Sequence, residues 1–556
     1  MRVLPSAIIA ICVLCLAACN QSQTANKANE DDGSAAISAD SMRQHIAVLS
    51  SDSFMGRKPF TAGETKTVAY LKEEFAKAGL EPGNGNSFVQ EVPMVNLLAT
   101  AAPQMQVTSK KGSFTLKAFD DYIIWTDKPD AKVSLDKSQL VFAGYGVVAP
   151  EYNWNDYEGL DVKGKVVMVM VNDPGFWAGD TTLFKGKEMT YYGRWTYKFE
   201  EAARQGAKGC LIIHNTAAAS YPFTVQQNNF NTSRLQLDNR GKNIKNCDVI
   251  GWLPESIANK LFAAAGFDST LLVKANKPGF KPVPLDLQLS TTMQVQAIYN
   301  KSYNVIGKIT GSKHPEEVII YSAHWDHLGI GTPDETGDSI YNGALDNASG
   351  TAGLLELARA FKNMKTPPER TLVFLAVTAE EQGLLGSAFY AQNPVYPVNK
   401  TVADINIDGL NPFGRTKDIV VIGAGQSDLE DYLKEATEKD SGYISFETHP
   451  EAGFYYRSDH FNFAKAGIPS LYTETGVDVV GKDTAYGKKL QTEYTTKHYH
   501  RPSDTYLPAT WTMEGGVQDL RLLFRVGKRL AFETTMPKWK PGSEFKAIRE
   551  KTTGLP

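Results

Sequence analysis

From about residue 286 to the C-terminus, short apolar segments alternate with amphipathic ones, and this alternation limits the folds open to the chain. The apolar runs at 317–322 and 371–377 have the length of strands, whereas 348–362 and 513–532 have the length and periodicity of helices. Strands that alternate with helices form mostly parallel sheets covered by helices on both faces. We therefore predict an α/β fold with a mixed, mostly parallel sheet sandwiched by helices.

Residues of metal-ligand type follow the predicted strands. Ligands of open α/β sheets bind in the crevice at the carboxyl ends of the strands. Imidazole and carboxylate groups bind zinc at about 2.0–2.2 Å, and one carboxylate can bridge two ions about 3.5–4 Å apart. The residues at these ends are of those two types: His324 and Asp326, Asp346, Glu380 and Glu381, Asp408, and His500 followed by Asp504. The sequence therefore predicts a metal site at this edge of the sheet.

The adjacent carboxylates Glu380 and Glu381 suit a division of labour. Neighbouring side chains after a strand point in different directions, so one can bind metal while the other handles a proton. Such a pair is usually solvated surface. Here the preceding run 372–377 is apolar throughout, as in a central strand buried on both faces. We expect its end to open into the crevice.

These motifs resemble the di-zinc aminopeptidase family that includes secreted bacterial leucyl aminopeptidases and glutamate carboxypeptidase II. The family pattern is His-x-Asp, Asp in a Gly/Asn-rich turn, Glu-Glu, Asp, Ser-Asp-His and Tyr-His-x-x-x-Asp-Thr. The resemblance covers most of the chain from about residue 40, and every position is filled: His324 and Asp326, Asp346, Glu380 and Glu381, Asp408, Ser458 to His460, Tyr499 and His500, Asp504 and Thr505. It implies a zinc-dependent exopeptidase, foremost an aminopeptidase acting on peptides.

The resemblance also implies a set of ligands for two zinc ions per chain. By it, His324 and Asp408 hold one zinc, Glu381 and His500 hold the other, and Asp346 bridges them. His327, His460 and His498 compete for the histidine positions. His500 is preferred over His498 because only His500 has the family's three-residue spacing to the Asp-Thr pair.

Three further residues carry catalytic roles by the same resemblance. Glu380 is the general base, which takes a proton from the metal-bridging water as that water attacks the scissile carbonyl. Asp326 fixes the tautomer of a ligand imidazole, and Tyr499 donates a hydrogen bond to the developing oxyanion. Asp459 has two open interpretations, a supporting role near the site or a helix cap.

Residues 126–285 have a different texture, with short apolar strands between Gly-rich turns and one expected helix at 197–205. The segments 157–167 and 202–209 resemble a protease-associated domain, which is often inserted in this family. We hypothesise that this module walls one side of the cleft and restricts substrate length. The predicted division is an N-terminal part of the peptidase domain at 40–125, the inserted module at 126–285 and the catalytic part at 286–556.

The N-terminus has the features of a secretory leader, because a basic residue precedes an apolar run at 7–16 that is too short to span a bilayer stably. The sequence Leu-Ala-Ala-Cys that ends at Cys19 resembles a bacterial lipoprotein cleavage box. By that resemblance Cys19 is lipidated, and Asn20 after it favours the outer membrane, facing the periplasm. We predict a signal peptide at 1–19 and a flexible tether at 20–39.

Charge and cysteine content limit the partners. Lys plus Arg number 58 against 62 Asp plus Glu, for a formal charge of −4, so nothing directs the chain to nucleic acid. Cys210 and Cys247 follow the leader and its cleavage box. An oxidising periplasm allows them to pair, and two buried free thiols are the equal alternative.

Other functions remain open on the same fold. A carboxypeptidase or dipeptidase would use the same ligands. A glutaminyl cyclase uses one zinc, and the complete five-ligand set counts against it. A non-catalytic receptor-like homologue would be marked by lost ligands, and none is lost in this sequence.

Overall fold

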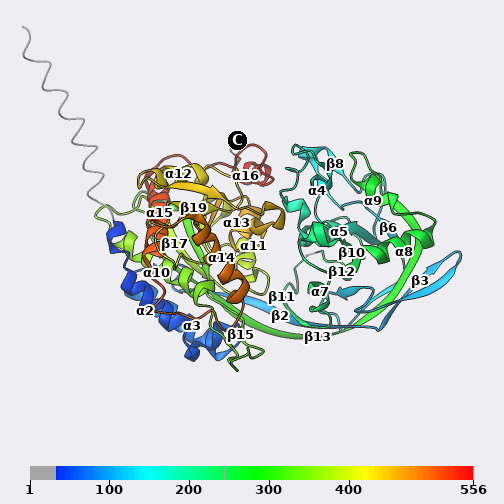
Figure 1. Ribbon diagram of the computed structural model, residues 1–556, viewed down its shortest axis with the longest axis horizontal. Coiled ribbons are helices and arrows are strands. Elements are labelled where there is room, and N and C mark those ends of the chain that lie inside the picture. Colours follow the sequence, from blue (N-terminus) through cyan, green and yellow to red (C-terminus); the bar gives the residue numbers. More distant parts are fainter. Residues whose placement is uncertain (1–32, 243–244, 555–556) are drawn as a thin grey trace, which may run out of the picture.

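The computed structural model describes residues 33–242 and 245–554, and it has two lobes joined by a long antiparallel ribbon (Figure 1). The ribbon consists of β2 (Val89–Ala101) and β13 (Val283–Ile309), which pair from Val89↔Val305 to Ala101↔Met293. The lobes are therefore connected through continuous hydrogen-bonded strands. The predicted signal peptide at 1–19 and Cys19 lie outside the described residues.

The first lobe contains the predicted α/β sheet. Its centre is β14 (His314–His324), which pairs in parallel with β17 (Arg370–Val377) on one side and β18 (Thr401–Ile407) on the other. The parallel order continues to β21 (Ser470–Thr475). The end of β13 and the strand β19 (Asp418–Val421) add antiparallel neighbours to β17 and β21. The predicted mixed, mostly parallel sheet is confirmed.

Helices cover both faces of this sheet, which explains why β17 is apolar at every position. Leu372 and Phe374 pack into a core with α10 (Gly350–Lys362) and α15 (Glu514–Phe532), whereas Val373 and Leu375 face the opposite core. A strand buried on both faces needs no polar alternation. The other helices of this lobe are α2 (Ala39–Leu49), α3 (Ala62–Lys77), α11 (Leu385–Gln392), α12 (Leu429–Glu438), α13 (His460–Lys465), α14 (Thr484–Lys497) and α16 (Lys546–Thr553).

The end of the predicted tether is ordered structure. Gly33–Ala36 form a short 3-10 helix against α10, where a Cβ on Gly33 would lie 2.1 Å from the carbonyl oxygen of Ala360. Ile37 is buried, and the Ser38 side chain accepts a hydrogen bond from the Ser41 amide at the start of α2. The prediction of a flexible segment as far as residue 39 was wrong, because an apolar residue and a helix cap draw this part onto the lobe.

The second lobe begins earlier in the sequence than predicted. Its core extends from Val95 to Val295 and includes Met105, Leu116 and Ile123. These last three lie in β3 (Gln104–Ser109), β4 (Gly112–Lys117) and β5 (Ile123–Trp125). The predicted boundary at residue 126 was too late, because β2 crosses from one lobe to the other as a single strand.

Four strands of the second lobe form a parallel array. They are β6 (Lys132–Phe142), β9 (Val166–Met170), β10 (Gly209–His214) and β12 (Val249–Pro254). The predicted helix is α5 (Trp195–Arg204), and α8 (Glu255–Ala265) and α9 (Thr270–Ala275) were not expected. Cys210 and Cys247 are both buried free thiols, so the unpaired alternative holds.

Short elements complete both lobes. None of the described helices is long and apolar enough to cross a membrane. The remaining strands and α-helices are β1 (Glu81–Pro82), β7 (Val148–Ala149), β8 (Trp154–Asn155), β11 (Ser233–Leu237), β15 (Gly329–Ile330), β16 (Ile340–Tyr341), β20 (Tyr443–Phe446), α4 (Gly175–Ala178), α6 (Thr216–Ala219) and α7 (Thr224–Gln227).

Candidate metal centre

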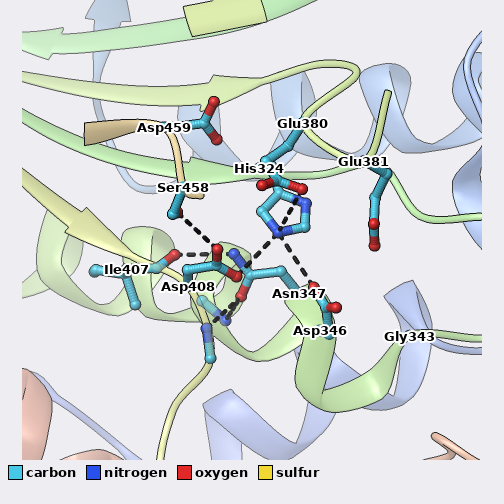
Figure 2. A network of polar contacts seen from close by, with 12 residues as sticks. His324, Gly343, Asp346, Asn347, Glu380, Glu381, Ile407, Asp408, Ser458 and Asp459 are labelled. Carbon is cyan, nitrogen blue, oxygen red and sulfur yellow. Dashed lines mark hydrogen bonds and ion pairs between the residues drawn. The ribbon is translucent and has the colours of Figure 1, made fainter. Parts of the chain in front are cut away.

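The carboxyl ends of three adjacent parallel strands bring the predicted ligands His324, Glu381 and Asp408 together (Figure 2). His324 ends β14, Glu380 and Glu381 follow β17, and Asp408 follows β18. Asp346 comes from the short helical segment η5 (Ala344–Ser349), which leads into α10. Residues far apart in sequence therefore meet at one edge of the sheet, where ligands of open α/β folds bind.

His324 lies between two carboxylates. Its Nε2 atom is 3.0 Å from Asp408 Oδ1 and 3.2 Å from Asp346 Oδ1, and the residue is 1% exposed. Its Nδ1 lies 3.1 Å from the carbonyl oxygen of Asp326, to which it donates, so in the neutral ring the Nε2 lone pair faces the carboxylates. Burial lowers the pKa of His324, but Asp408 and Glu380 outweigh it and hold that pKa well above its ordinary value. This position therefore favours a bound positive charge.

His500 makes the corresponding contacts on the other side of Asp346. Its Nε2 atom lies 3.1 Å from Asp346 Oδ2 and 3.1 Å from Glu381 Oε2. Each oxygen of Asp346 therefore faces a different imidazole. Burial lowers the pKa of His500, but hydrogen bonds to Asp346 and Glu381 raise it overall to about 10.

His327 also reaches this second group. Its Nδ1 atom is 2.6 Å from Glu381 Oε1, yet the two atoms are not aligned as a hydrogen bond, and both are buried without a hydrogen-bond partner among the described residues. Donor atoms of His327, Asp346 and Glu381 all lie within 4.8 Å of one another. The resemblance implies His500 as the ligand beside Glu381, and the structure brings both imidazoles to Glu381.

These donor sets fit divalent cations. His324, Asp346 and Asp408 form one group whose donor atoms lie within 4.8 Å of one another, and the group around Glu381 shares Asp346 with it. Imidazole and carboxylate are zinc ligands. Buried ligand atoms that have no hydrogen-bond partner among the described residues, such as Glu381 Oε1, are costly unless a cation satisfies them.

Glu380 stands beside the first group, with Oε2 3.9 Å from His324 Nε2. Burial raises its pKa well above the ordinary value, and the nearby charge of Asp408 adds to the shift while His324 opposes it. Asp326 Oδ1 accepts a hydrogen bond from the Glu380 amide at 3.0 Å. The backbone carbonyl of Asp326 lies 3.1 Å from His324 Nδ1, and its carboxylate lies 3.8 Å from the same atom. Asp326 therefore contacts both His324 and Glu380.

Tyr499 lies over the second group. Its ring stacks on His500 with 3.9 Å between centroids and 22° between planes, and it is 47% exposed. The phenol is therefore accessible to a molecule that enters from solvent.

A second set of polar residues holds the ligands in place. Ser458 Oγ donates to Asp408 Oδ2 at 2.7 Å (Figure 2). Asn406 Nδ2 donates to Ser458 Oγ at 2.7 Å. Asp504 accepts the amides of Leu345 and Asp346 at 3.0 and 3.1 Å. Such contacts orient metal ligands. Ser458 and Asp504 belong to the recognised motifs, and those motifs are the signal for them in the sequence.

Asn347 joins the two loops that carry Asp346 and Asp408. Its Nδ2 donates to the Ile407 carbonyl at 2.9 Å, and its Oδ1 accepts the Gly409 amide at 3.0 Å (Figure 2). The sequence motifs assign no role to Asn347, and its position directly after Asp346 was the available signal.

The remaining candidates lie outside the two groups. Asp459 precedes α13 without a capping hydrogen bond and instead accepts from Ser387 Oγ at 2.5 Å, so the helix-cap interpretation was wrong. His460 packs between two tyrosine rings, and burial lowers its pKa to about 3. His498 Nδ1 lies 3.1 Å from Ser503 Oγ.

Comparison with known proteins agrees with this geometry. Residues 304–524 match the family model described as Peptidase family M28. This segment is therefore similar to peptidase family M28. It contains all the ligand-type residues described above, from His324 to His500.

Similar proteins include named aminopeptidases. Leucine aminopeptidase 2 of Trichophyton rubrum is 29% identical over 233 residues, which cover 39% of this chain and 43% of that protein. Aminopeptidase YwaD of Bacillus subtilis is 28% identical over 373 residues, covering 65% of this chain and 62% of that protein. The chain thus spans less than two thirds of these relatives. The solved aminopeptidase from Aneurinibacillus sp. strain AM-1 aligns with a TM-score of 0.47 at 20% identity, covering 92% of this chain and 96% of that one.

Proposed function

We propose that this protein is a zinc-dependent exopeptidase that removes N-terminal residues from peptides. The observation that carries the proposal is the pair of imidazole–carboxylate groups that share Asp346 at the edge of the sheet, with Glu380 beside them. The aminopeptidases among the similar proteins support the choice of terminus.

The proposed cofactor is two zinc ions per chain. His324 and Asp408 would hold one ion, Glu381 and His500 the other, and Asp346 both. Bound zinc would polarise the scissile carbonyl and lower the pKa of a water molecule to about 7. His327, which is buried against Glu381, would hold the Glu381 carboxylate in position.

The chain's own groups would move the proton and stabilise the developing charge. Glu380, held through its amide by Asp326, would accept a proton from the attacking water and pass it to the leaving amine. Tyr499 would donate a hydrogen bond to the oxygen of the scissile carbonyl as it becomes negative, an interaction that strengthens in the transition state.

We propose that the second lobe is a protease-associated domain that walls one side of the cleft and limits substrate length. Its Met189 amide donates to the Pro450 carbonyl at 3.2 Å, and Tyr191 packs edge to face on Phe461, with 5.4 Å between ring centroids. These contacts flank the loop that leads to Ser458, the partner of Asp408. A change in peptide-length preference after Tyr191→Ala would support this role, and an unchanged preference would remove it.

The proposed location is the outer membrane, with a lipid on Cys19 and the enzyme facing the periplasm. The lipoprotein-type sequence before Cys19 supports this. Cys19→Ser should release the protein from the membrane fraction, whereas retention there would contradict the proposed anchor.

Four versions of one peptide test the reaction: unblocked, N-acetylated, C-amidated and doubly blocked. An aminopeptidase cleaves the unblocked and amidated forms and spares both acetylated ones. Cleavage of the acetylated form with a free C-terminus would instead indicate a carboxypeptidase. If the zinc-loaded chain cleaved none of them, the receptor-like alternative would replace the proposal. The Glu380→Ala variant controls for a contaminating peptidase.

A further inference from the structure

Arg57 is buried beside the candidate metal centre although it lies far from it in sequence. It ends the short segment η2 (Asp52–Arg57) between α2 and α3, and it is 1% exposed. Its Nε donates to the Trp325 carbonyl at 2.8 Å, and Nη2 donates to the Gly343 carbonyl at 2.8 Å. Nη1 donates to the carbonyls of Leu49 and Asn342, at 2.7 and 2.6 Å.

These acceptors lie on the two backbone segments that present the ligands. Trp325 stands between His324 and Asp326, and Gly343 precedes Asp346 by three residues. One guanidinium therefore fixes the distance between the loop after β14 and the segment that leads into η5. A planar group with five N–H donors in a rigid fork can do this, whereas an ammonium on a flexible stem cannot.

The positive charge of Arg57 lies close to the carboxylates of the metal centre. Burial lowers its pKa to about 10, while the nearby carboxylates of Asp504, Asp326, Asp346 and Glu381 raise it. A buried cation that bonds only to carbonyls is costly unless negative charge lies close by. Here the acids of the metal centre supply that charge.

We propose that Arg57 is a positioning residue that sets the spacing of the two ligand segments, so that zinc affinity and turnover depend on it. This inference rests on the proposed zinc-dependent function. Arg57 acts through the backbone of Trp325 and Gly343, and the substrate does not contact it.

Arg370 offers a matched control. It is 2% exposed and donates to the carbonyls of Leu530, Thr535 and Thr534 at 2.6, 3.3 and 3.4 Å, and to Glu317 at 2.6 Å. It begins β17, whereas Glu380 follows the other end of that strand. The two arginines thus match in burial and in the number of acceptors, and only Arg57 braces the metal centre.

The test compares Arg57→Lys with Arg370→Lys in the full chain. Zinc affinity is measured by competition with a chelator, kcat and KM with a C-amidated peptide, and the thermal midpoint on metal-free protein. Arg57→Lys should weaken zinc binding about 10- to 100-fold, the range found for groups that orient metal ligands. It should lower kcat with little change in KM. Arg370→Lys should lower the thermal midpoint comparably without changing zinc affinity or kcat.

Equal zinc affinity and kcat in the two variants would overturn the inference and leave Arg57 a structural residue. If Arg57→Lys does not fold, Arg57→Gln and Arg370→Gln, which bury no charge, replace the pair under the same criteria. A wild-type chain that binds no zinc would overturn the proposed function and this inference together. Normal zinc binding by wild type and Arg57→Lys alike would overturn the inference alone.

Discussion

Each lobe buries a cluster of ionisable side chains, and the two clusters differ in how their polar atoms are satisfied. In the second lobe, Asp156, Asp173 and Lys198 are buried together. Asp173 Oδ2 accepts hydrogen bonds from the amide and hydroxyl of Thr190, at 2.9 and 2.7 Å, and Lys198 donates to the Asn172 carbonyl at 2.7 Å. The cluster combines acids with a base, and its charged groups are hydrogen-bonded within the lobe.

We call the cluster in the second lobe closed, because its charged groups are hydrogen-bonded, and the cluster at the metal centre open, because some of its polar atoms are not. Its imidazoles meet several carboxylates, and Glu381 Oε1 and both ring nitrogens of His327 are buried without hydrogen-bond partners among the described residues. A buried charge alone is thus weak evidence for a site. Metal-ligand atoms without well-aligned hydrogen bonds that converge at the ends of parallel strands are stronger evidence, because one bound cation would satisfy several of them at once.

The largest effect should come from Glu380→Gln. The amide keeps the shape of the side chain but cannot accept the proton, so turnover should fall about 10²- to 10⁴-fold. Zinc content, measured by atomic absorption, should be unchanged. Loss of metal from this variant would mean that Glu380 and Glu381 have exchanged roles.

A substitution in the closed cluster of Asp156, Asp173 and Lys198 should lower the unfolding free energy rather than the turnover. Lys198→Met removes its cation and leaves two buried acids, which should cost about 3–5 kcal/mol of unfolding free energy. Urea denaturation followed by Trp fluorescence measures this. Turnover of the folded fraction at saturating peptide should stay at the wild-type value, and a specific loss of turnover would contradict the separation between the clusters.

The stability of Lys198→Met should depend on pH in a defined direction. In the wild type, burial raises the pKa of Asp156 and Asp173 to about 7, above the ordinary 3.8, although the charge of Lys198 lowers it. Removing Lys198 should therefore raise both pKa values further. The folded state therefore holds protons that the unfolded state has released, and the unfolding free energy falls as pH rises between these values. The loss relative to wild type should shrink from pH 8 to pH 5, and an equal loss at both would contradict this account.

The two histidines at Glu381 provide a sharper test of the open cluster. If His500 is the ligand and His327 its support, His327→Ala should weaken zinc binding about 10- to 100-fold. His500→Ala should weaken it more. The reverse order in a chelator competition would assign the ligand role to His327.

The smallest effect is expected for Ser458→Ala, which removes one hydrogen bond from Asp408. Zinc affinity should fall about 10-fold, at the low end for groups that orient a ligand. Ser470→Ala is the control, because Ser470 is also buried but donates to the Ile468 carbonyl instead, at 3.0 Å. Equal affinities in the two variants would remove the orienting role of Ser458.

The strands and helices that could be predicted from the sequence are those marked by a pattern of apolar residues within the element itself. The apolar run of β17 and the acids after it follow from burial on both faces and from strand direction, so Glu380 and Glu381 could be placed at the crevice. α14 was missed because, of its described residues, only Gly487 is buried, which leaves no apolar stripe to detect.

The features that could not be predicted from the sequence depend on contacts between distant segments. The role of Arg57 requires the carbonyls of Trp325 and Gly343, which are 268 and 286 residues away. The boundary of the second lobe depends on β2 crossing between lobes, and no composition change marks that point. His327 competes with His500 for a ligand position, and both reach Glu381.

The most direct test of the central claim is an anomalous difference map at the zinc absorption edge from crystals of the zinc-loaded protein. The account predicts two peaks on either side of Asp346, one beside His324 and Asp408 and the other beside Glu381. Peaks confined to the exposed group His314, Glu316 and Glu317, or none at the sheet edge, would contradict it.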